Sequence, residues 1–184
     1  MKIAIITIIV LVILIGIWVI SIYNSLQKAR VMVDNQWGQI QTEIEKRFSL
    51  IPNLVNTVKG YAKHEATTLE EVIKMRSNFS NANKEEQNKM MNTMSQKINQ
   101  FLINVEQYPE LKANQNFLNL QEELQKIEED IALQRKLYND AISTFNMRLV
   151  TFPTNIVAKM LGFKEMPVFT ANEAAQTAPV VSFE

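Results

Sequence analysis

The segment spanning residues 3–22, IAIITIIVLVILIGIWVISI, most constrains what this chain can fold into, because it contains twenty consecutive residues without a charge. A helix of that length extends about 30 Å, which matches the hydrocarbon thickness of a bilayer. Trp18 and Tyr23 stand near one end, where amphipathic rings favour the membrane–water interface. The apolar run is longer than the usual core of a cleaved signal peptide, and no small-residue cleavage motif follows it.

We therefore predict an uncleaved, single-pass transmembrane anchor over residues 1–23. The lipid bilayer of a cell membrane is its expected partner, and the residues expected to span it include Ile3, Val10, Leu14, Trp18 and Ile22. The flanking charges favour neither orientation. Lys2 and the amino terminus stand on one side, while Lys28 and Arg30 stand on the other, so the positive-inside bias nearly cancels.

The composition excludes several classes of function. Lys+Arg and Asp+Glu both total 19, so the net charge is zero and no overall field attracts nucleic acid. The chain has no cysteine, which removes disulfides, thiolate catalysis and cysteine-rich metal sites. Only 4 glycines and 5 prolines are present, a composition that favours long helices with few turns.

Downstream of the anchor, apolar residues recur at helical spacing in four segments. The third is the most regular, with Met91, Met94, Ile98, Phe101 and Val105. Between the segments lie SNFSNANKEE, where Asn or Ser can cap the third helix, then EQYPEL and VTFPTN. A short helix closed by Gly162 follows. We predict an all-α fold, in which the N-terminal transmembrane helix is followed by an elongated antiparallel four-helix bundle over residues 24–163 and a flexible C-terminal tail over residues 164–184.

The stretch between residues 45 and 72 resembles a site at first, because it combines the only histidine, His64, with Glu65, four basic residues and Pro52. It could be an active site, a ligand-binding loop or a helix junction. Helical di-metal sites need two histidines, HEATT lacks the second histidine of H-E-x-x-H, and the four glycines are isolated. We therefore predict no catalytic residue, no metal and no cofactor. An enzyme of unknown type that uses His64, Glu65 or Glu43 stays as a minor alternative.

The helix-junction interpretation gives three local predictions. Pro52 lacks an N–H and fits the first turn of a helix. A tight turn is expected over residues 49–52, with a new helix after it. Gly60 is expected to be a close-packing position beside Tyr61.

Arginines lie on or beside the apolar stripes and have two interpretations. They could form buried layers with Glu43, Glu65 or Glu128 that fix helix register, or they could extend their charged heads into water. We expect a mixture with one or two buried pairs. The predicted register or packing residues are Arg30, Trp37, Arg47, Pro52, Gly60, Tyr61, Glu65, Arg76, Arg135 and Arg148.

Two long stretches resemble the signatures of the LemA family of bacterial membrane proteins. The first begins YNSLQKARVMVDNQWGQIQTEIEKRF and continues through IPNLV, KGYA and HE. The second runs from YPELKANQNF to NIVAKMLGF. Together they cover nearly the whole chain, which departs from the family pattern in VDNQW and in its short tail. The resemblance implies one membrane-spanning helix, a helical bundle and no established enzymatic activity. A family relative associated with magnetosome membranes suggests, by analogy, a role in membrane organisation.

These observations favour a non-enzymatic, membrane-anchored scaffold or interaction protein of the bacterial envelope that forms homo-oligomers. The alternative is an adaptor for membrane-protein quality control or envelope stress, with a protease or chaperone as its partner at the membrane. The terminal APVVSFE could add a strand to a neighbouring chain or dock in its groove, through Val180, Val181 and Phe183, or it could be a frayed end.

Overall fold

The computed structural model describes residues 1–169, except for the side chains of residues 63–66. Over the described residues the fold is all-α, as predicted, with helices and no strand. The helices are α1 (Lys2–Val58), α2 (Lys63–Phe79), α3 (Lys84–Val105), α4 (Pro109–Lys112), α5 (Gln115–Val150) and α6 (Thr154–Met160). They form two compact units. Unit 1 combines Met1–Gln39 with Arg135–Val168, and unit 2 contains Ile40–Gln134.

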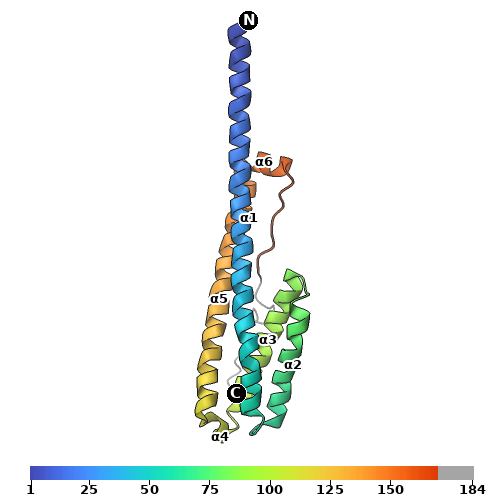
Figure 1. Ribbon diagram of the computed structural model, residues 1–184, viewed down its shortest axis with the longest axis vertical. Coiled ribbons are helices and arrows are strands. Elements are labelled where there is room, and N and C mark those ends of the chain that lie inside the picture. The colour runs from blue at the N-terminus through green and yellow to red at the C-terminus, as the bar shows by residue number, and fades with distance from the viewer. Residues whose placement is uncertain (170–184) are drawn as a thin grey trace, which may run out of the picture. The chain divides into compact units, whose positions relative to one another are not determined.

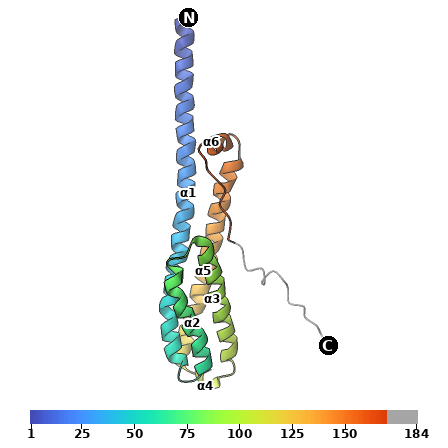
Figure 2. The ribbon, with the colours of Figure 1, turned by 90° about the vertical axis from the view of Figure 1, so that its right-hand side faces the viewer.

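Unit 2 is an antiparallel bundle of four helical segments, namely the end of α1, all of α2 and α3, and the start of α5 (Figures 1 and 2). Aromatic rings join neighbouring helices in its core. Phe48 of α1 meets Phe79 of α2 with ring centroids 5.7 Å apart, and Phe101 of α3 meets Phe117 of α5 at 6.3 Å. The apolar stripes read from the sequence therefore face one another in this unit.

The start of α3 follows the predicted capping chemistry. The Asn83 side chain accepts a hydrogen bond from the Glu86 backbone N–H at 3.0 Å, and the Glu86 carboxylate accepts one from the Asn83 N–H at 3.0 Å. This capping box satisfies two backbone donors that a helix end leaves without partners. The Gln87 side chain then donates to the Phe79 carbonyl at 2.8 Å in the buried interior, which ties α3 to the end of α2.

The turn predicted at residues 49–52 is wrong. α1 continues through Pro52 to Val58, and the chain reverses over residues 59–62. The apolar stripe explains the difference, because Ile51 just before the proline and Leu54 and Val58 after it are fully buried. Burying those side chains stabilises the helix by more than the interior proline costs, which is about 3 kcal/mol.

The close packing predicted at Gly60 is wrong as well. Gly60 lies in the exposed turn after α1, and a Cβ added to it would meet nothing within 4 Å. The backbone N–H groups of Tyr61 and Ala62 donate to the Val58 carbonyl at 2.9 Å, and they close the turn. Gly60 therefore marks the helix end, where apolar spacing stops, rather than a contact between helices.

Unit 1 holds the start of α1 together with the end of α5 and α6. The Trp37 ring packs on that of Tyr138 with centroids 5.3 Å apart. Burial, together with the negative charge of Asp34, raises the pKa of the Tyr138 hydroxyl. Further along, Arg148 donates to the Ser25 carbonyl at 3.1 Å and to its hydroxyl at 2.8 Å. α1 and α5 are thus joined by the aromatic contact between Trp37 and Tyr138 and, further along, by the hydrogen bonds from Arg148 to Ser25.

The chain ends α6 with the expected glycine. Gly162 has a φ of 74°, and its N–H donates to the Lys159 carbonyl at 3.2 Å. The Phe163 N–H donates to Ala158 at 3.0 Å, which completes a Schellman motif. The following chain crosses back over α5, where the Asn146 side chain bonds both the N–H and the carbonyl of Met166 at 2.9 and 2.8 Å.

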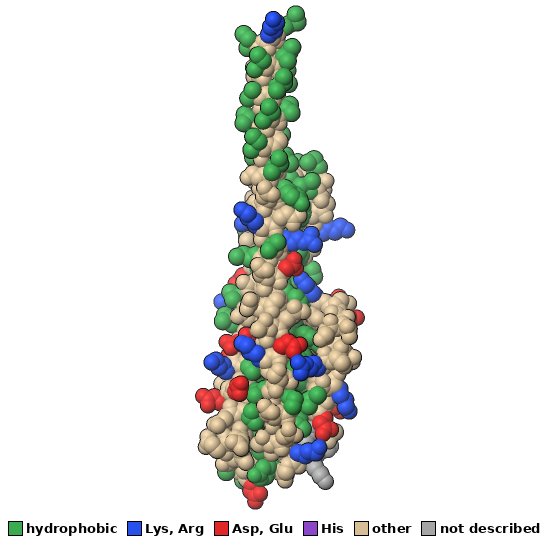
Figure 3. Space-filling view, viewed as in Figure 1, with side chains coloured by type: hydrophobic (Ala, Val, Ile, Leu, Met, Phe, Trp, Pro, Cys, Tyr) green, Lys and Arg blue, Asp and Glu red, His purple; other side chains and the backbone are tan. Residues whose placement is uncertain are grey.

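The first part of α1 leaves its apolar side chains uncovered (Figure 3). Ile3, Val10 and Leu14 are exposed, as is Trp18, while Ile22 is half-buried. Over the described residues α1 is the one helix that is long and apolar enough to cross a membrane, judged by length and composition. The structure therefore fits the predicted N-terminal transmembrane helix.

Replacing Pro52 with alanine tests why α1 passes through this position. Pro52→Ala restores a backbone donor for the Phe48 carbonyl and removes a steric clash, so we expect the free energy of unfolding to rise by about 1–3 kcal/mol. Urea unfolding in detergent, followed by circular dichroism, measures the change. The exposed neighbour Asn53→Ala is the control and should shift stability by less than about 0.5 kcal/mol. A loss of stability in Pro52→Ala would contradict the explanation.

Candidate functional site

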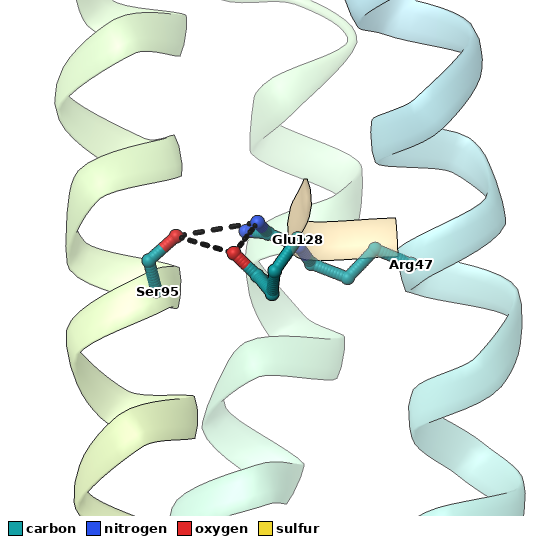
Figure 4. A network of polar contacts seen from close by, with 3 residues as sticks. All are labelled: Arg47, Ser95 and Glu128. Carbon is teal, nitrogen blue, oxygen red and sulfur yellow. Dashed lines mark hydrogen bonds and ion pairs between the residues drawn. The ribbon is translucent and has the colours of Figure 1, made fainter. Parts of the chain in front are cut away.

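A buried ion pair at the centre of unit 2 is the strongest polar feature of the described residues (Figure 4). Arg47 of α1 has a side chain with no exposed surface, and its Nη2 donates to Glu128 Oε2 of α5 at 2.5 Å. Ser95 of α3 completes the network. Its hydroxyl accepts from Arg47 at 3.2 Å and donates to Glu128 at 3.2 Å. One cation therefore joins three helices.

The position of Arg47 in α1 explains why its charge is buried. It lies within the apolar stripe between Ile44 and Ile51, so the helix face that packs into the core carries it inward. A buried guanidinium requires a carboxylate and further hydrogen bonds. Glu128, whose side chain is 28% exposed, supplies the carboxylate from the edge of the core, and Ser95 supplies the hydroxyl.

A second pair between an arginine and a glutamate lies at the surface. Arg76 of α2 pairs with Glu45 of α1 at 3.0 Å, and about half of each side chain is exposed. Glu43 is buried, yet it forms an ion pair with Lys46 on the same helix at 2.8 Å. The hydrogen bond that Lys46 donates to the Glu43 carboxylate raises the pKa of the Lys46 ammonium. The spacing of residues in the sequence did not distinguish the buried Arg47 from the exposed Arg76.

The remaining predicted residues fall in several settings. Trp37 is buried, Arg135 is half-buried, and Arg30 is exposed beside Tyr23 and Phe163 on a shallow groove of unit 1. Tyr61 is exposed in the turn after α1, where its hydroxyl accepts from Asn114 at 3.3 Å. The side chains of His64 and Glu65, and the tail residues Val180, Val181 and Phe183, lie outside the described residues.

Ser95 is a functional candidate that the sequence reading missed. It stands next to Met94 in α3 and is half-buried, and positions 91, 94, 95 and 98 share one helix face whose other three residues are buried. A polar residue on such a face is a signal that a buried charge needs a partner. That signal was present in the spacing of the third segment.

Exposed charges in unit 2 form pairs across and along helices. Lys97 of α3 donates to Glu71 of α2 at 2.6 Å, and this hydrogen bond lowers the pKa of the Glu71 carboxyl. Lys89 does the same to Glu85 one turn away on α3. In the part of the chain that the structure describes, no group of three or more His, Cys, Asp or Glu side chains comes together as a metal site would require.

Comparison with known proteins agrees with the resemblance to the LemA family that the sequence motifs indicated. The model of the LemA family matches residues 36–183. The chain belongs to the LemA family. The match contains all three members of the buried network, Arg47, Ser95 and Glu128. It begins after the predicted transmembrane segment, so the family assignment rests on the helical domain.

Two relatives show how far the likeness of this LemA-family chain extends. Protein LemA of Metamycoplasma hominis is 27% identical over 155 residues, which cover 82% of this chain and 69% of the relative. Magnetosome protein MamQ 2 of Paramagnetospirillum magneticum is 33% identical over 78 residues. That alignment covers 42% of this chain and 28% of the magnetosome protein, so the likeness to MamQ concerns a minor part of it.

Removing the buried cation tests the central network. Arg47→Met removes the guanidinium that binds Glu128 and Ser95, and we expect the free energy of unfolding to fall by about 3 kcal/mol. This value is at the low end for a broken buried ion pair, because the Glu128 side chain is partly exposed. Denaturant unfolding of the full chain in detergent measures this loss. The double variant Arg47→Met/Glu128→Leu should recover most of it, since both charges are then gone.

Arg76→Met provides the matched control, because it breaks an exposed Arg–Glu pair of similar geometry. We expect its effect to stay below about 1 kcal/mol. Equal losses in the free energy of unfolding for Arg47→Met and Arg76→Met would show that the buried pair stabilises the bundle no more than the exposed pair does.

Proposed function

We propose that this LemA-family chain is a non-enzymatic, single-pass membrane protein of the bacterial envelope whose helical domain is a self-associating scaffold. The observation that carries the proposal is the uncovered apolar start of α1, where Ile3–Ile20 includes a long series of side chains about half or more exposed. Such a surface is stable in hydrocarbon and costly in water. Anchoring in a bilayer confines copies of the chain to two dimensions and raises the frequency of their encounters.

The polar chemistry of the folded part supports a structural role. The buried charge of Arg47 is committed to Glu128 and Ser95, and exposed charges such as Lys97 and Glu71 pair between helices. These groups hold helices together instead of converging on a pocket, where a substrate would need them. A scaffold of this kind requires a fixed arrangement of helices more than it requires reactive groups.

Exposed apolar side chains on unit 1 provide a surface for lateral contact. Val31 and Met32 of α1 are 54% and 59% exposed, and they lie about two helical turns after the end of the anchor. Adjacent anchored copies present such residues at the same height above the bilayer. The relatives named magnetosome proteins support a role in organising membranes, by analogy.

Counting copies in single vesicles tests self-association. The full chain, fused to a fluorescent protein and released in native membrane vesicles, should bleach in several steps more often than random co-encapsulation allows. Val31→Glu/Met32→Glu places charge on the proposed contact surface and should reduce the multi-step fraction at least twofold. Asn35→Glu/Gln39→Glu adds the same charge to exposed polar positions of α1 and should leave it unchanged.

Single-step bleaching of the native chain at every density would refute self-association. Mass spectrometry of the same vesicles distinguishes the alternative role. Recovery of a protease or chaperone in a fixed ratio to the chain would favour the adaptor hypothesis over the scaffold.

A further inference from the structure

A second apolar surface lies on unit 1, beside the end of the apolar run in α1 and formed by other elements of the chain. It consists of the end of α5, the connection that follows and one face of α6. Its side chains are between 44% and 75% exposed and belong to Val150, Phe152, Ile156, Met160 and Leu161. We call these five residues the α6 surface. On α6 itself Ile156 and Met160 point one way, one turn apart, while Val157 and Ala158 on the other side are buried.

The α6 surface is held beside the end of the apolar run in α1. Phe163, which follows α6, packs its ring against Tyr23 with centroids 6.2 Å apart and against Phe145 at 6.4 Å. Arg148, two residues before Val150, bonds to Ser25. Tyr23 and Ser25 directly follow the predicted membrane-spanning residues 3–22. Both views of the ribbon show α6 beside α1 (Figures 1 and 2).

The charged side chains around the α6 surface are mainly cations, with Glu165, which lines a groove together with Lys164 and Arg30, as the exception. Residues 19–33 of α1 and residues 141–164 contain no Asp or Glu. Their cations are Lys28, Arg30, Arg148, Lys159 and Lys164. Figure 3 shows Lys and Arg side chains next to hydrophobic ones just below the bare part of the helix. Apolar side chains bordered by cations are the composition that partitions into the headgroup region of an anionic bilayer.

We propose that the α6 surface is a second membrane contact, in which Phe152, Ile156 and Met160 insert into the headgroup–acyl boundary of the bilayer that α1 crosses. Lys159 and Lys164 then face the phosphates of anionic lipids. The inference rests on the proposed anchoring by α1, because the anchor brings the α6 surface to the level of the bilayer. Continuity favours lipid over a second protein copy, since the α6 surface extends the apolar surface of the anchor itself at the point where it leaves the hydrocarbon.

A membrane contact at α6 also gives the unusual composition of the α5–α6 connection a physical reason. Phe152 is 75% exposed and Met160 is 68% exposed, and large apolar residues at such exposure are unfavourable in water. In the interfacial region the same side chains are covered by lipid. The Schellman motif at Gly162 and the bonds from Asn146 to Met166 fix the chain after α6, so its apolar face keeps one direction.

Depth measurement with single cysteines tests the proposal, because the native chain contains none. Four full-length variants, Ile156→Cys, Met160→Cys, Val12→Cys and Lys136→Cys, carry an environment-sensitive fluorophore in vesicles of phosphatidylcholine with 30% phosphatidylglycerol. Nitroxide lipids then report contact with the bilayer. Lys136 is exposed on α5, about 20 Å from Val150 by the helical rise, and is the control outside the membrane.

We expect shallow nitroxides to quench labels at Ile156 and Met160 at least twice as strongly as the label at Lys136, and deep nitroxides to quench Val12. Lys159→Glu/Lys164→Glu in the labelled Ile156→Cys background should lower its quenching, and so should removal of phosphatidylglycerol. Both changes weaken attraction to anionic headgroups without touching the anchor.

Three other results would count against the account in different ways. Quenching at Val12 with Ile156 and Met160 no different from Lys136 overturns the α6 contact and leaves the anchoring intact. An unquenched Val12 overturns the proposed anchoring itself. Labels at Ile156 and Met160 that are shielded from both nitroxide lipid and aqueous iodide, and become exposed to iodide on dilution into excess lipid, identify a second copy as the occupant and overturn the lipid contact.

Discussion

Covering the apolar surface of α1 is the constraint on which the rest of the structure depends. Between residues 3 and 22 the helix is apolar on every side, and up to residue 18 no other described part of the chain covers it. Further along, apolar residues occupy one stripe that includes Leu26, Val33, Ile40 and Ile44, all fully buried by protein. The same helix thus has two apolar parts, an uncovered one whose length and composition fit a bilayer and one that neighbouring helices cover.

The buried pair of Arg47 and Glu128 is the polar element within that apolar packing. Apolar stripes on four helices can shift past one another by one helical turn at modest cost. A buried guanidinium, in contrast, needs a carboxylate at one particular position along the bundle axis. Ser95 restricts the possible helix registers further, because its hydroxyl both accepts a hydrogen bond from Arg47 and donates one to Glu128. We infer that this network selects one helix register in unit 2, and its stabilising contribution is secondary to that selection.

The sequence predicted the elements that depend on local periodicity and missed those that depend on distant partners. The stripe through Met91, Met94, Ile98 and Phe101 correctly indicated a helix, and Asn83 and Gly162 correctly marked ends, because caps require particular side chains or a positive φ. Pro52 misled the prediction. Its local preference for a helix start was outweighed by the burial of Ile51, Leu54 and Val58, which tertiary packing alone determines.

The candidate site shows the same division. Arg47 and Arg76 both lie near apolar stripes, and neighbouring residues do not tell which is buried. What distinguishes them is Glu128, which is 81 positions away in the chain from Arg47 and reaches it only through the packing of α5. The position of α6 beside the end of the anchor was beyond sequence reasoning for the same reason, since it depends on the contact between Phe163 and Tyr23.

The most direct test of the central claim is whether the start of α1 is integral to a membrane. Alkaline carbonate extraction of bacterial membranes that contain the full chain separates integral from peripheral proteins. The account predicts that the native chain stays in the membrane pellet, whereas Val10→Arg/Leu14→Arg, which places two charges near the bilayer centre at roughly 2.5–3.5 kcal/mol each, moves substantially to the supernatant. Release of the native chain by carbonate would contradict the account.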